Sequence, residues 1–262
     1  MNSLNHLFRL DNKVAGVTGG SSGIGRAMAW ALGMQGARLV LVARTSEALD
    51  YTVATFAQDG IVAKVVVADL GNHEHLTRAV HECNVAFADD KAAHAPDIVI
   101  NAAGNNIRKP LPDLTDEDIR ATLAVNLEAP LALIRSFAPA MAAKGWGRII
   151  NIGSQQSFRA FNNSGVYGIS KGAIISLTRS TAEYYSKFGV TCNTIAPNFV
   201  HTPLTEVAMK NPAFAETQAA KTMIGRNAVP ADFHGAAIFL ASDASAMVTG
   251  HTLYVDGGYS AK

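Results

Sequence analysis

The most informative stretch of this chain is VAGVTGGSSGIG at residues 14–25. A run of small and β-branched residues ends at Thr18, and a helix-length amphipathic segment follows from Gly25. Glycines at such a junction permit a tight turn and close approach of a pyrophosphate, which the unpaired N–H groups and positive dipole of a helix N-terminus attract. The spacing is Gly-x3-Gly-x-Gly, and its position between a first strand and a first helix predicts a dinucleotide-binding loop.

The alternation of strand and helix continues along the whole chain. Predicted strands, rich in Val and Ile, are residues 14–18, 38–42, 62–67, 97–101, 148–152, 190–195 and 252–255. Predicted helices are residues 25–34, 46–58, 73–88, 116–143, 166–188 and 230–240. Apolar strands without polar alternation are typical of strands covered on both faces, and their alternation with helices indicates βαβ units. We therefore predict an α/β fold, a single doubly wound Rossmann-like domain over residues 1–262, with a seven-stranded parallel sheet and helices on both faces.

Residues 198–225 break this alternation. The segment follows the sixth predicted strand and is loop-like at its ends, and Pro203 and Pro212 interrupt it. A long segment at the carboxyl end of a parallel strand is typical of a lid over a ligand site. We predict that residues 198–225 form a mobile substrate lid with no single uninterrupted helix.

Composition excludes several classes of protein. Lys and Arg number 22 against 21 Asp and Glu, so the net charge of +1 argues against nucleic-acid binding through phosphate neutralisation. The apolar share of 48% excludes disorder. With only Cys83 and Cys192, the chain is no disulfide scaffold. No apolar run of signal-peptide or membrane-spanning length is present, so we expect a cytoplasmic protein without a membrane partner. Its His and Cys residues lack zinc-type spacing, and we predict no metal site.

Seven motifs carry a resemblance to a known family. They are T-G-x3-G-I-G at 18–25, Asp69 at the end of the third strand, N-x-A-G at 101–104, Asn126 in V-N-L, Ser154 thirteen residues before Y-x3-K at 167–171, P-x4-T at 197–202, and V-D-G-G at 255–258. Together they resemble the short-chain dehydrogenase/reductase family over residues 10–259. Asn198 departs from the pattern by standing where the family usually has glycine, and Asn adopts positive φ more readily than most residues.

The resemblance implies an oxidoreductase that transfers hydride between a nicotinamide cofactor and a hydroxyl or carbonyl group. It implies a catalytic set consisting of Asn126, Ser154, Tyr167 and Lys171. It also implies cofactor contacts from Gly19, Ser21, Ser22, Gly23, Ile24, Gly25, Arg44, Asp69, Leu70, Asn101, Ala102, Gly104, Tyr167, Lys171, Pro197, Val200 and Thr202. Family members usually assemble through the two long helices, so a homotetramer is expected.

The spacing of Tyr167 and Lys171 has a chemical use. Residues four apart on a helix share one face. A phenol with an ordinary pKa near 10 exchanges protons poorly at neutral pH, and a neighbouring ammonium favours the phenolate. We therefore expect Lys171 to lower the pKa of Tyr167, which then serves as general base in oxidation and general acid in reduction. Ser154, at the carboxyl edge of the sheet, is placed to hold the substrate oxygen.

The end of the second strand bears on the choice of cofactor. An acid there binds the 2′-OH of NAD, whereas an Arg accommodates the 2′-phosphate of NADP. This chain has Ala43 and then Arg44, and a guanidinium binds phosphate in bidentate fashion. NADP(H) is the preferred cofactor on this ground, with NAD(H) as the alternative.

Within the family the chain most resembles gluconate 5-dehydrogenase-like oxidoreductases of sugar acids and polyols. The resemblance rests on residues 105–110, the I-G-S-Q-Q-S stretch at 152–157, and G-A-A-I-F-L at 235–240. Arg108 is a candidate for a substrate carboxylate, and Gln155 for a hydroxyl. A 3-oxoacyl-carrier-protein reductase is the alternative enzyme. A catalytically silent dinucleotide-binding module is the alternative of another class. A small-molecule substrate is the expected partner in the leading interpretation.

Overall fold

The structure is a computed structural model that describes residues 4–88 and 95–262. Across these residues, seven parallel strands form one sheet in the order β3-β2-β1-β4-β5-β6-β7. The strands are β1 (Val14–Thr18), β2 (Arg38–Ala43), β3 (Ala63–Val67), β4 (Ile98–Asn101), β5 (Gly147–Ile152), β6 (Val190–Pro197) and β7 (Thr252–Val255). All seven predicted strands are present within two residues of their expected ends, and the parallel seven-stranded sheet is confirmed.

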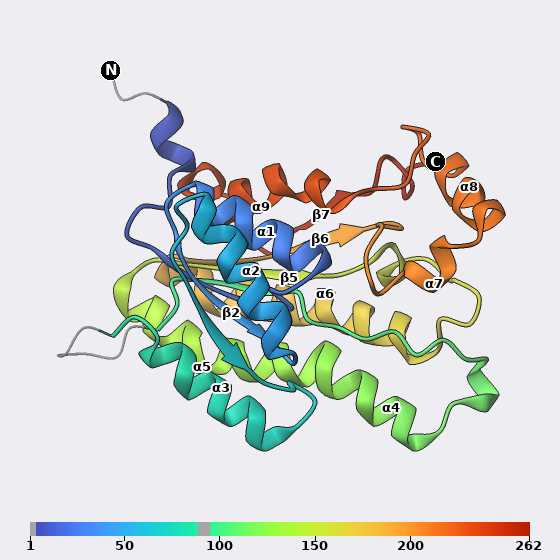
Figure 1. Ribbon diagram of the computed structural model, residues 1–262, viewed down its shortest axis with the longest axis horizontal. Helices are drawn as coiled ribbons and strands as arrows, with labels where there is room; N and C mark the ends of the chain where they lie inside the picture. The colour runs from blue at the N-terminus through green and yellow to red at the C-terminus, as the bar shows by residue number, and fades with distance from the viewer. Residues whose placement is uncertain (1–3, 89–94) are drawn as a thin grey trace.

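Helices cover both faces of the sheet, as predicted (Figure 1). They are α1 (Gly23–Met34), α2 (Ser46–Gln58), α3 (His73–Val85), α4 (Asp116–Leu123), α5 (Ala129–Lys144), α6 (Gly165–Tyr185), α7 (Glu206–Met209), α8 (Pro212–Ala220) and α9 (His234–Ala241). Helices α1, α2 and α9 pack into one apolar cluster with the sheet, and α3, α5 and α6 into the other. The single helix predicted over residues 230–240 is a 3-10 turn (Pro230–Phe233) followed by α9.

The prediction of one helix over residues 116–143 is wrong. Helix α4 begins with a capping box in which the Thr115 hydroxyl accepts from the Asp118 N–H. The chain then passes through a π-helical stretch (Ala124–Glu128) before α5 begins. Pro130 explains the break, because it has no N–H to donate to the carbonyl four residues earlier. The π turn places the Asn126 side chain toward the sheet edge, where it bonds to Asn105.

Residues 198–225 contain two short helices, α7 and α8. Pro212 occupies the first turn of α8, where its missing N–H costs nothing, and the Asn211 side chain accepts from the Phe214 N–H. The segment ends close to its start, because Val200 pairs with Ala228 in an isolated parallel bridge. In Figure 1 both helices stand at one end of the molecule, beyond the carboxyl end of β6.

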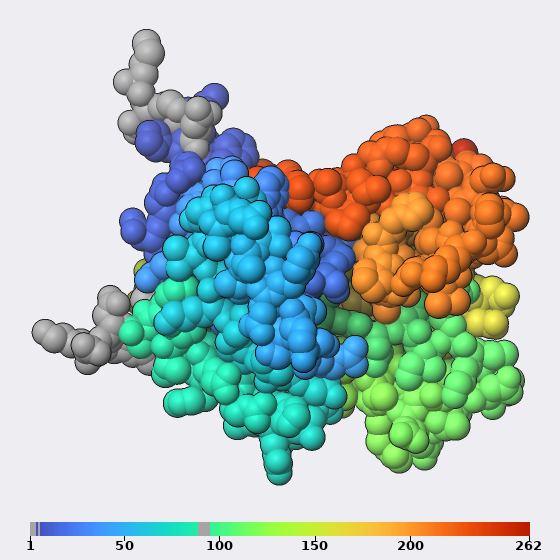
Figure 2. Space-filling view, in the orientation of Figure 1, coloured from blue at the N-terminus to red at the C-terminus, as the bar shows by residue number. Residues whose placement is uncertain are grey.

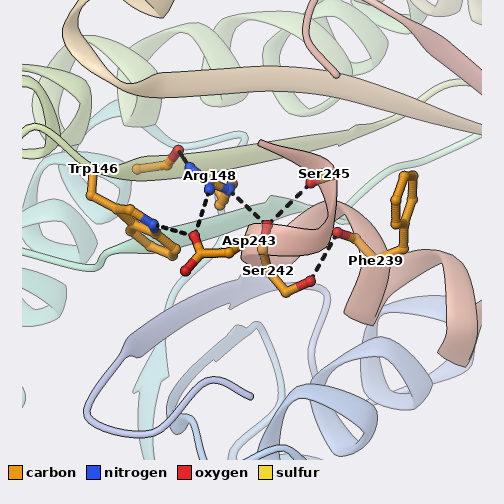
Figure 3. Close-up of polar contacts among 7 residues, drawn as sticks. Trp146, Arg148, Phe239, Ser242, Asp243 and Ser245 are labelled. Atoms are coloured by element: carbon orange, nitrogen blue, oxygen red, sulfur yellow. Dashed lines mark hydrogen bonds and ion pairs between the residues drawn. The ribbon is translucent and has the colours of Figure 1, made fainter. Parts of the chain in front are cut away.

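At the amino ends of the strands, a buried arginine anchors β5 (Figure 3). Arg148, at the start of β5, is 3% exposed and donates to the Ser242 carbonyl at 3.1 Å and to Asp243 Oδ1 at 3.0 Å. Trp146 Nε1 donates to the same carboxylate oxygen at 2.8 Å. Burial lowers the pKa of Arg148, and Asp243 opposes that shift. These contacts tie the amino end of β5 to the turn that follows α9.

Candidate active site

A cavity of about 400 Å³ lies at the carboxyl ends of the strands, where the chain crosses between β1 and β4. In parallel α/β sheets this switch point is where ligands bind. Figure 2 shows the corresponding hollow between the blue N-terminal region and the orange lid helices. The predicted site residues that line it are Gly19, Ser21, Ser22, Gly23, Ile24, Gly25, Arg44, Asp69, Leu70, Ala102, Gly104, Ser154, Tyr167, Lys171, Pro197, Val200 and Thr202.

The glycine-rich loop has the geometry that its sequence predicts. Gly19 adopts φ +67°, and a Cβ there would lie 3.0 Å from the Ala102 backbone. A Cβ on Gly25 would collide with the Gly19 carbonyl. Helix α1 begins at Gly23, so the unpaired N–H groups of its first turn face this end of the cavity. The loop can therefore accept a phosphate group at backbone distance.

Thr18 is a positioning residue that the sequence analysis missed. Its hydroxyl accepts from the N–H groups of Ala102 and Ala103, both at 3.1 Å. These bonds attach the segment after β4 to the end of β1. The sequence feature that could have identified this role is the position of Thr18 at the start of the glycine-rich motif. Asn101 was predicted as a cofactor contact, but it lies beneath the cavity wall and donates to Asn151 Oδ1 at 2.8 Å.

Three of the four predicted catalytic residues come from α6 and from the turn after β5. Tyr167 and Lys171 lie one turn apart on α6, and Ser154 lies two residues after the end of β5; all three line the cavity and are buried. The Ser154 hydroxyl accepts from the Gln156 N–H at 3.1 Å. Lys171 Nζ donates to the Ile152 carbonyl at 2.7 Å. Hydroxyl, phenol and ammonium groups therefore meet at one wall of the cavity.

Asn126 lies behind this wall rather than in it. Its Oδ1 accepts from the Asn105 N–H at 2.9 Å, and its Nδ2 donates to the Asn105 carbonyl and to Ser170 Oγ, both at 3.0 Å. Asn105 itself lines the cavity. Asn126 therefore reaches the cavity through Asn105, a neighbour that the sequence motif did not single out.

The pKa values depart from the sequence-based expectation. Burial raises the pKa of Tyr167 above its ordinary value of 10.0, and the Ser154 hydroxyl only partly opposes this. Burial also lowers the pKa of Lys171 to about 8. The lowered pKa of Tyr167 that was expected from Lys171 is not found, since burial raises it instead. The ammonium lies 5.7 Å from the phenol ring centre and donates to a backbone carbonyl, so desolvation dominates.

The two predicted substrate residues lie outside the cavity lining. Arg108 is exposed, donates to the Asn162 carbonyl at 3.3 Å and stacks 5.2 Å from the Phe161 ring centre. Gln155 is 3% exposed and opens a short 3-10 turn. Asn198 does line the cavity. The positive φ that motivated its comparison with glycine is found, among described non-glycine residues, at Asn12 and Asn163 instead.

The described residues contain neither a metal-binding cluster nor a membrane-spanning helix. Within residues 4–88 and 95–262, no group of three or more His, Cys, Asp or Glu side chains is arranged to hold a metal ion. Across the same described residues, no helix combines the length and apolarity needed to cross a bilayer.

Known proteins resemble this chain over nearly its whole length. A family model described as "Enoyl-(Acyl carrier protein) reductase" matches residues 18–260. Galactitol 2-dehydrogenase (L-tagatose-forming) from Cereibacter sphaeroides is 37% identical over 258 residues, which is 97% of each chain. Gluconate 5-dehydrogenase from Gluconobacter oxydans is 33% identical, covering 96% of each chain. The structure of a gluconate 5-dehydrogenase from Burkholderia cenocepacia in complex with NADP and tartrate has a TM-score of 0.91 at 34% identity, covering 98% of this chain and 99% of that one.

These similarities agree with the sequence motifs described above and with the parallel sheet of the structure. The family model spans the glycine-rich loop, the Ser154 turn, helix α6 and the C-terminal strand. The relatives match end to end, so the agreement concerns the whole fold and not one motif. The chain is a member of the short-chain dehydrogenase/reductase family, an oxidoreductase of CH–OH groups.

Proposed function

We propose that this protein transfers hydride between NADP(H) and a hydroxyl or carbonyl carbon of a sugar, a sugar acid or a small keto compound. The observation that carries the proposal is one cavity lined by both the glycine-rich loop and the group of Ser154, Tyr167 and Lys171. The start of α1 would hold the pyrophosphate of a dinucleotide, and these three side chains would meet its nicotinamide end.

The roles of the side chains follow from their positions. A nicotinamide cofactor held in this cavity would supply the hydride for carbonyl reduction or take it up in alcohol oxidation. The Ser154 hydroxyl holds the substrate oxygen, and Tyr167 takes the hydroxyl proton in oxidation or donates it in reduction. Lys171 binds the nicotinamide ribose in this proposal. Asn126 holds Asn105 at the cavity edge and takes part in a water-linked proton relay.

Arg44 supports NADP(H) over NAD(H). It follows the end of β2, is exposed and lines the cavity together with Ser21, Ser22 and Thr45. Residue 43, the usual position of the ribose-binding acid, is an alanine. A 2′-phosphate placed here meets a guanidinium and hydroxyl groups, whereas a bare ribose meets no carboxylate at position 43.

Arg44→Asp is expected to reverse this preference. The variant removes the phosphate's cationic partner and supplies an acid for the 2′-OH. The ratio of kcat/KM for NADPH over NADH is expected to fall by about 10- to 10²-fold, since one charged hydrogen bond contributes roughly 1.5–3 kcal/mol. Arg120→Asp, an exposed arginine on α4, is the matched control. A ratio that changes equally in both variants would exclude Arg44 as the discriminating residue.

The substrate class rests on the relatives and on the polar lining of the cavity. Relatives named for galactitol and gluconate act on polyhydroxylated compounds, and Asn105, Asn198 and Thr205 line this cavity. The test is a turnover panel of galactitol, D-threitol, gluconate and 5-ketogluconate with both cofactors. A 3-oxoacyl-carrier-protein substrate is included as the alternative. Turnover of the acyl substrate alone would replace the proposal with the reductase function, and no turnover at all would favour a silent binding module.

Residues 198–225 form the lid in this proposal. Leu204 and Thr205 line the cavity, and α7 has no buried side chain. We expect hydrogen exchange in this segment to slow when NADP(H) and a substrate analogue bind, most strongly around α7, because closure excludes water from the reacting atoms. Exchange that is equally slow in the free and bound protein would identify a static wall instead.

We also propose a homotetramer in the cytoplasm. Leu131 on α5 and Ile169, Tyr184 and Phe188 at α6 are between 41% and 60% exposed, which leaves an apolar surface on the helix pair. Light scattering at micromolar concentration is expected to give about four times the chain mass of 27.6 kDa. Ile169→Asp is expected to give smaller species. A wild-type monomer would refute the assembly.

A further inference from the structure

The C-terminal segment, residues 256–262, lies against the lid in the structure. The Gly257 carbonyl accepts from the N–H groups of Met223 at 2.7 Å and Ile224 at 3.2 Å. The Asp256 carboxylate accepts from the N–H groups of Gly258 and Ser260, both at 2.9 Å, and so fixes the turn of the segment. Figure 1 places the C-terminus beside α8.

Two side chains of this segment bind α8 directly. The Tyr259 hydroxyl donates to Gln218 Oε1 at 3.3 Å, and these side chains belong to residues that are 5% and 3% exposed. Lys262 Nζ donates to the Ala220 carbonyl at 2.7 Å, at the last residue of α8. The C-terminal segment therefore holds the second half of α8 from outside.

Arg159 connects the same segment to the loop after Ser154. Its Nη1 donates to the Tyr259 carbonyl at 3.0 Å, and its Nη2 donates to the Lys262 carbonyl at 3.1 Å. Its backbone N–H donates to the Gln155 carbonyl at 3.1 Å, within the turn that begins at Ser154. A continuous path of hydrogen bonds thus runs from the Ser154 turn through Arg159 and Tyr259 to α8.

Helix α8 is anchored on its inner side as well. Phe214 packs edge to face on Phe199 with ring centres 5.2 Å apart, and Asn227 Nδ2 donates to the Ala215 carbonyl at 2.8 Å. Helix α7 differs, since Val207 is 88% exposed and the adjoining Leu204 is 52% exposed. The lid therefore contains a firmly attached helix, α8, and a loosely attached one, α7.

We propose that Arg159 is a positioning residue for substrate binding, which it achieves by holding α8 through the C-terminal segment at a set distance from Ser154. The inference rests on the proposed function, because α8 meets the same cavity through Phe214 and Phe199, and the two neighbours of Phe199 in the chain, Asn198 and Val200, line that cavity. Arg159 lies outside the cavity lining and affects the substrate only through Tyr259 and α8. Its loss is expected to weaken substrate binding while the chemistry and the cofactor contacts are retained.

The first test is kinetic. Arg159→Ala is expected to raise KM for the best panel substrate by about three- to tenfold, a modest change because Arg159 is exposed and affects the substrate only through Tyr259 and α8. The kcat and the NADPH affinity are expected to stay within twofold. Arg159→Lys, which restores one donor, is expected to recover part of the loss. Arg9→Ala, which removes an exposed arginine paired with Asp11 at the N-terminus, is the matched control.

A double-mutant cycle tests the path itself. If Arg159 acts through Tyr259, then Tyr259→Phe is expected to raise KM as well, and the double variant is expected to show much less than the product of the two effects. Multiplying effects, an unchanged KM in Arg159→Ala, or an equal loss of NADPH affinity would overturn the proposal.

Hydrogen exchange separates this inference from the proposed function. In Arg159→Ala with NADPH bound, exchange in residues 212–220 is expected to speed up, while exchange in α6 stays as in the wild type. This measurement needs no substrate, so it decides the role of Arg159 even if no panel compound is turned over. Unchanged exchange in α8 would refute the role, whereas absence of turnover by the wild type would refute only the proposed function.

Discussion

Tyr167→Phe is expected to lower kcat by about 10²–10⁴-fold while NADPH affinity stays within a few-fold of the wild type. The substitution removes only the phenolic oxygen and its exchangeable proton, and loss of a positioned general acid or base has an effect of this size. The aromatic ring, which is 9% exposed, keeps its packing in the variant. Single-turnover kinetics and fluorescence titration of NADPH measure the two quantities separately.

Tyr184→Phe provides the control for Tyr167→Phe. Tyr184 lies on the same helix, carries the same functional group and is 57% exposed. Its variant is expected to keep wild-type turnover. A Tyr167→Phe enzyme with turnover near that of the Tyr184→Phe enzyme would remove Tyr167 from the proposed chemistry.

Lys171→Met is expected to reduce turnover by about 10²–10³-fold, the usual range for removing one preorganised donor or charge from an active site. Methionine preserves the length of the side chain but neither binds ribose nor stabilises a phenolate. Cofactor affinity is expected to fall as well, which distinguishes this variant from Tyr167→Phe. Lys187→Met, at an exposed position after α6, is expected to leave both quantities unchanged.

Lys171→Met also changes the dependence of stability on pH. Burial lowers the pKa of Lys171 from 10.5 to about 8, so between these values the unfolded chain binds more protons at this residue than the folded chain. The contribution of Lys171 to the free energy of unfolding is therefore constant below pH 8 and rises between pH 8 and 10.5, by about 3 kcal/mol in total.

Urea unfolding of the wild type and the Lys171→Met variant at several pH values measures that contribution. The stability of the wild type relative to the variant is expected to increase across the window between pH 8 and 10.5. A constant difference across it would show that Lys171 titrates in the folded protein as it does in water.

Local patterns were sufficient for the fold. The apolar runs around Val14, Val40 and Ile150 predicted strands because such runs are covered on both faces, and each became a strand of the sheet. The glycine-rich loop was equally predictable, since only small residues fit where the Gly25 position meets the Gly19 carbonyl. Ser154, Tyr167 and Lys171 were singled out by the resemblance to a known family, and the structure brings these three side chains to one cavity.

Predictions that needed the direction of a side chain were less reliable. Arg108 and Gln155 were expected at the substrate, yet one stacks on Phe161 and the other is buried in a turn. The pKa of Tyr167 was predicted in the wrong direction, because the spacing gave its distance along the helix from Lys171 but not the bond from Lys171 to Ile152. The π turn after Leu123 was missed although Pro130 marks its position.

The sheet and the glycine-rich loop could be predicted from local patterns in the sequence, and the candidate residues Ser154, Tyr167 and Lys171 from the motifs of a known family. The bonds of Asn126 to Asn105 and of Arg159 to Tyr259, a residue 100 positions away, could be seen only in the folded chain. Such bonds form when the sheet brings the carboxyl ends of β4, β5 and β7 to one edge. These bonds join loops, which have no periodic sequence pattern, so the bonds cannot be predicted from the local sequence.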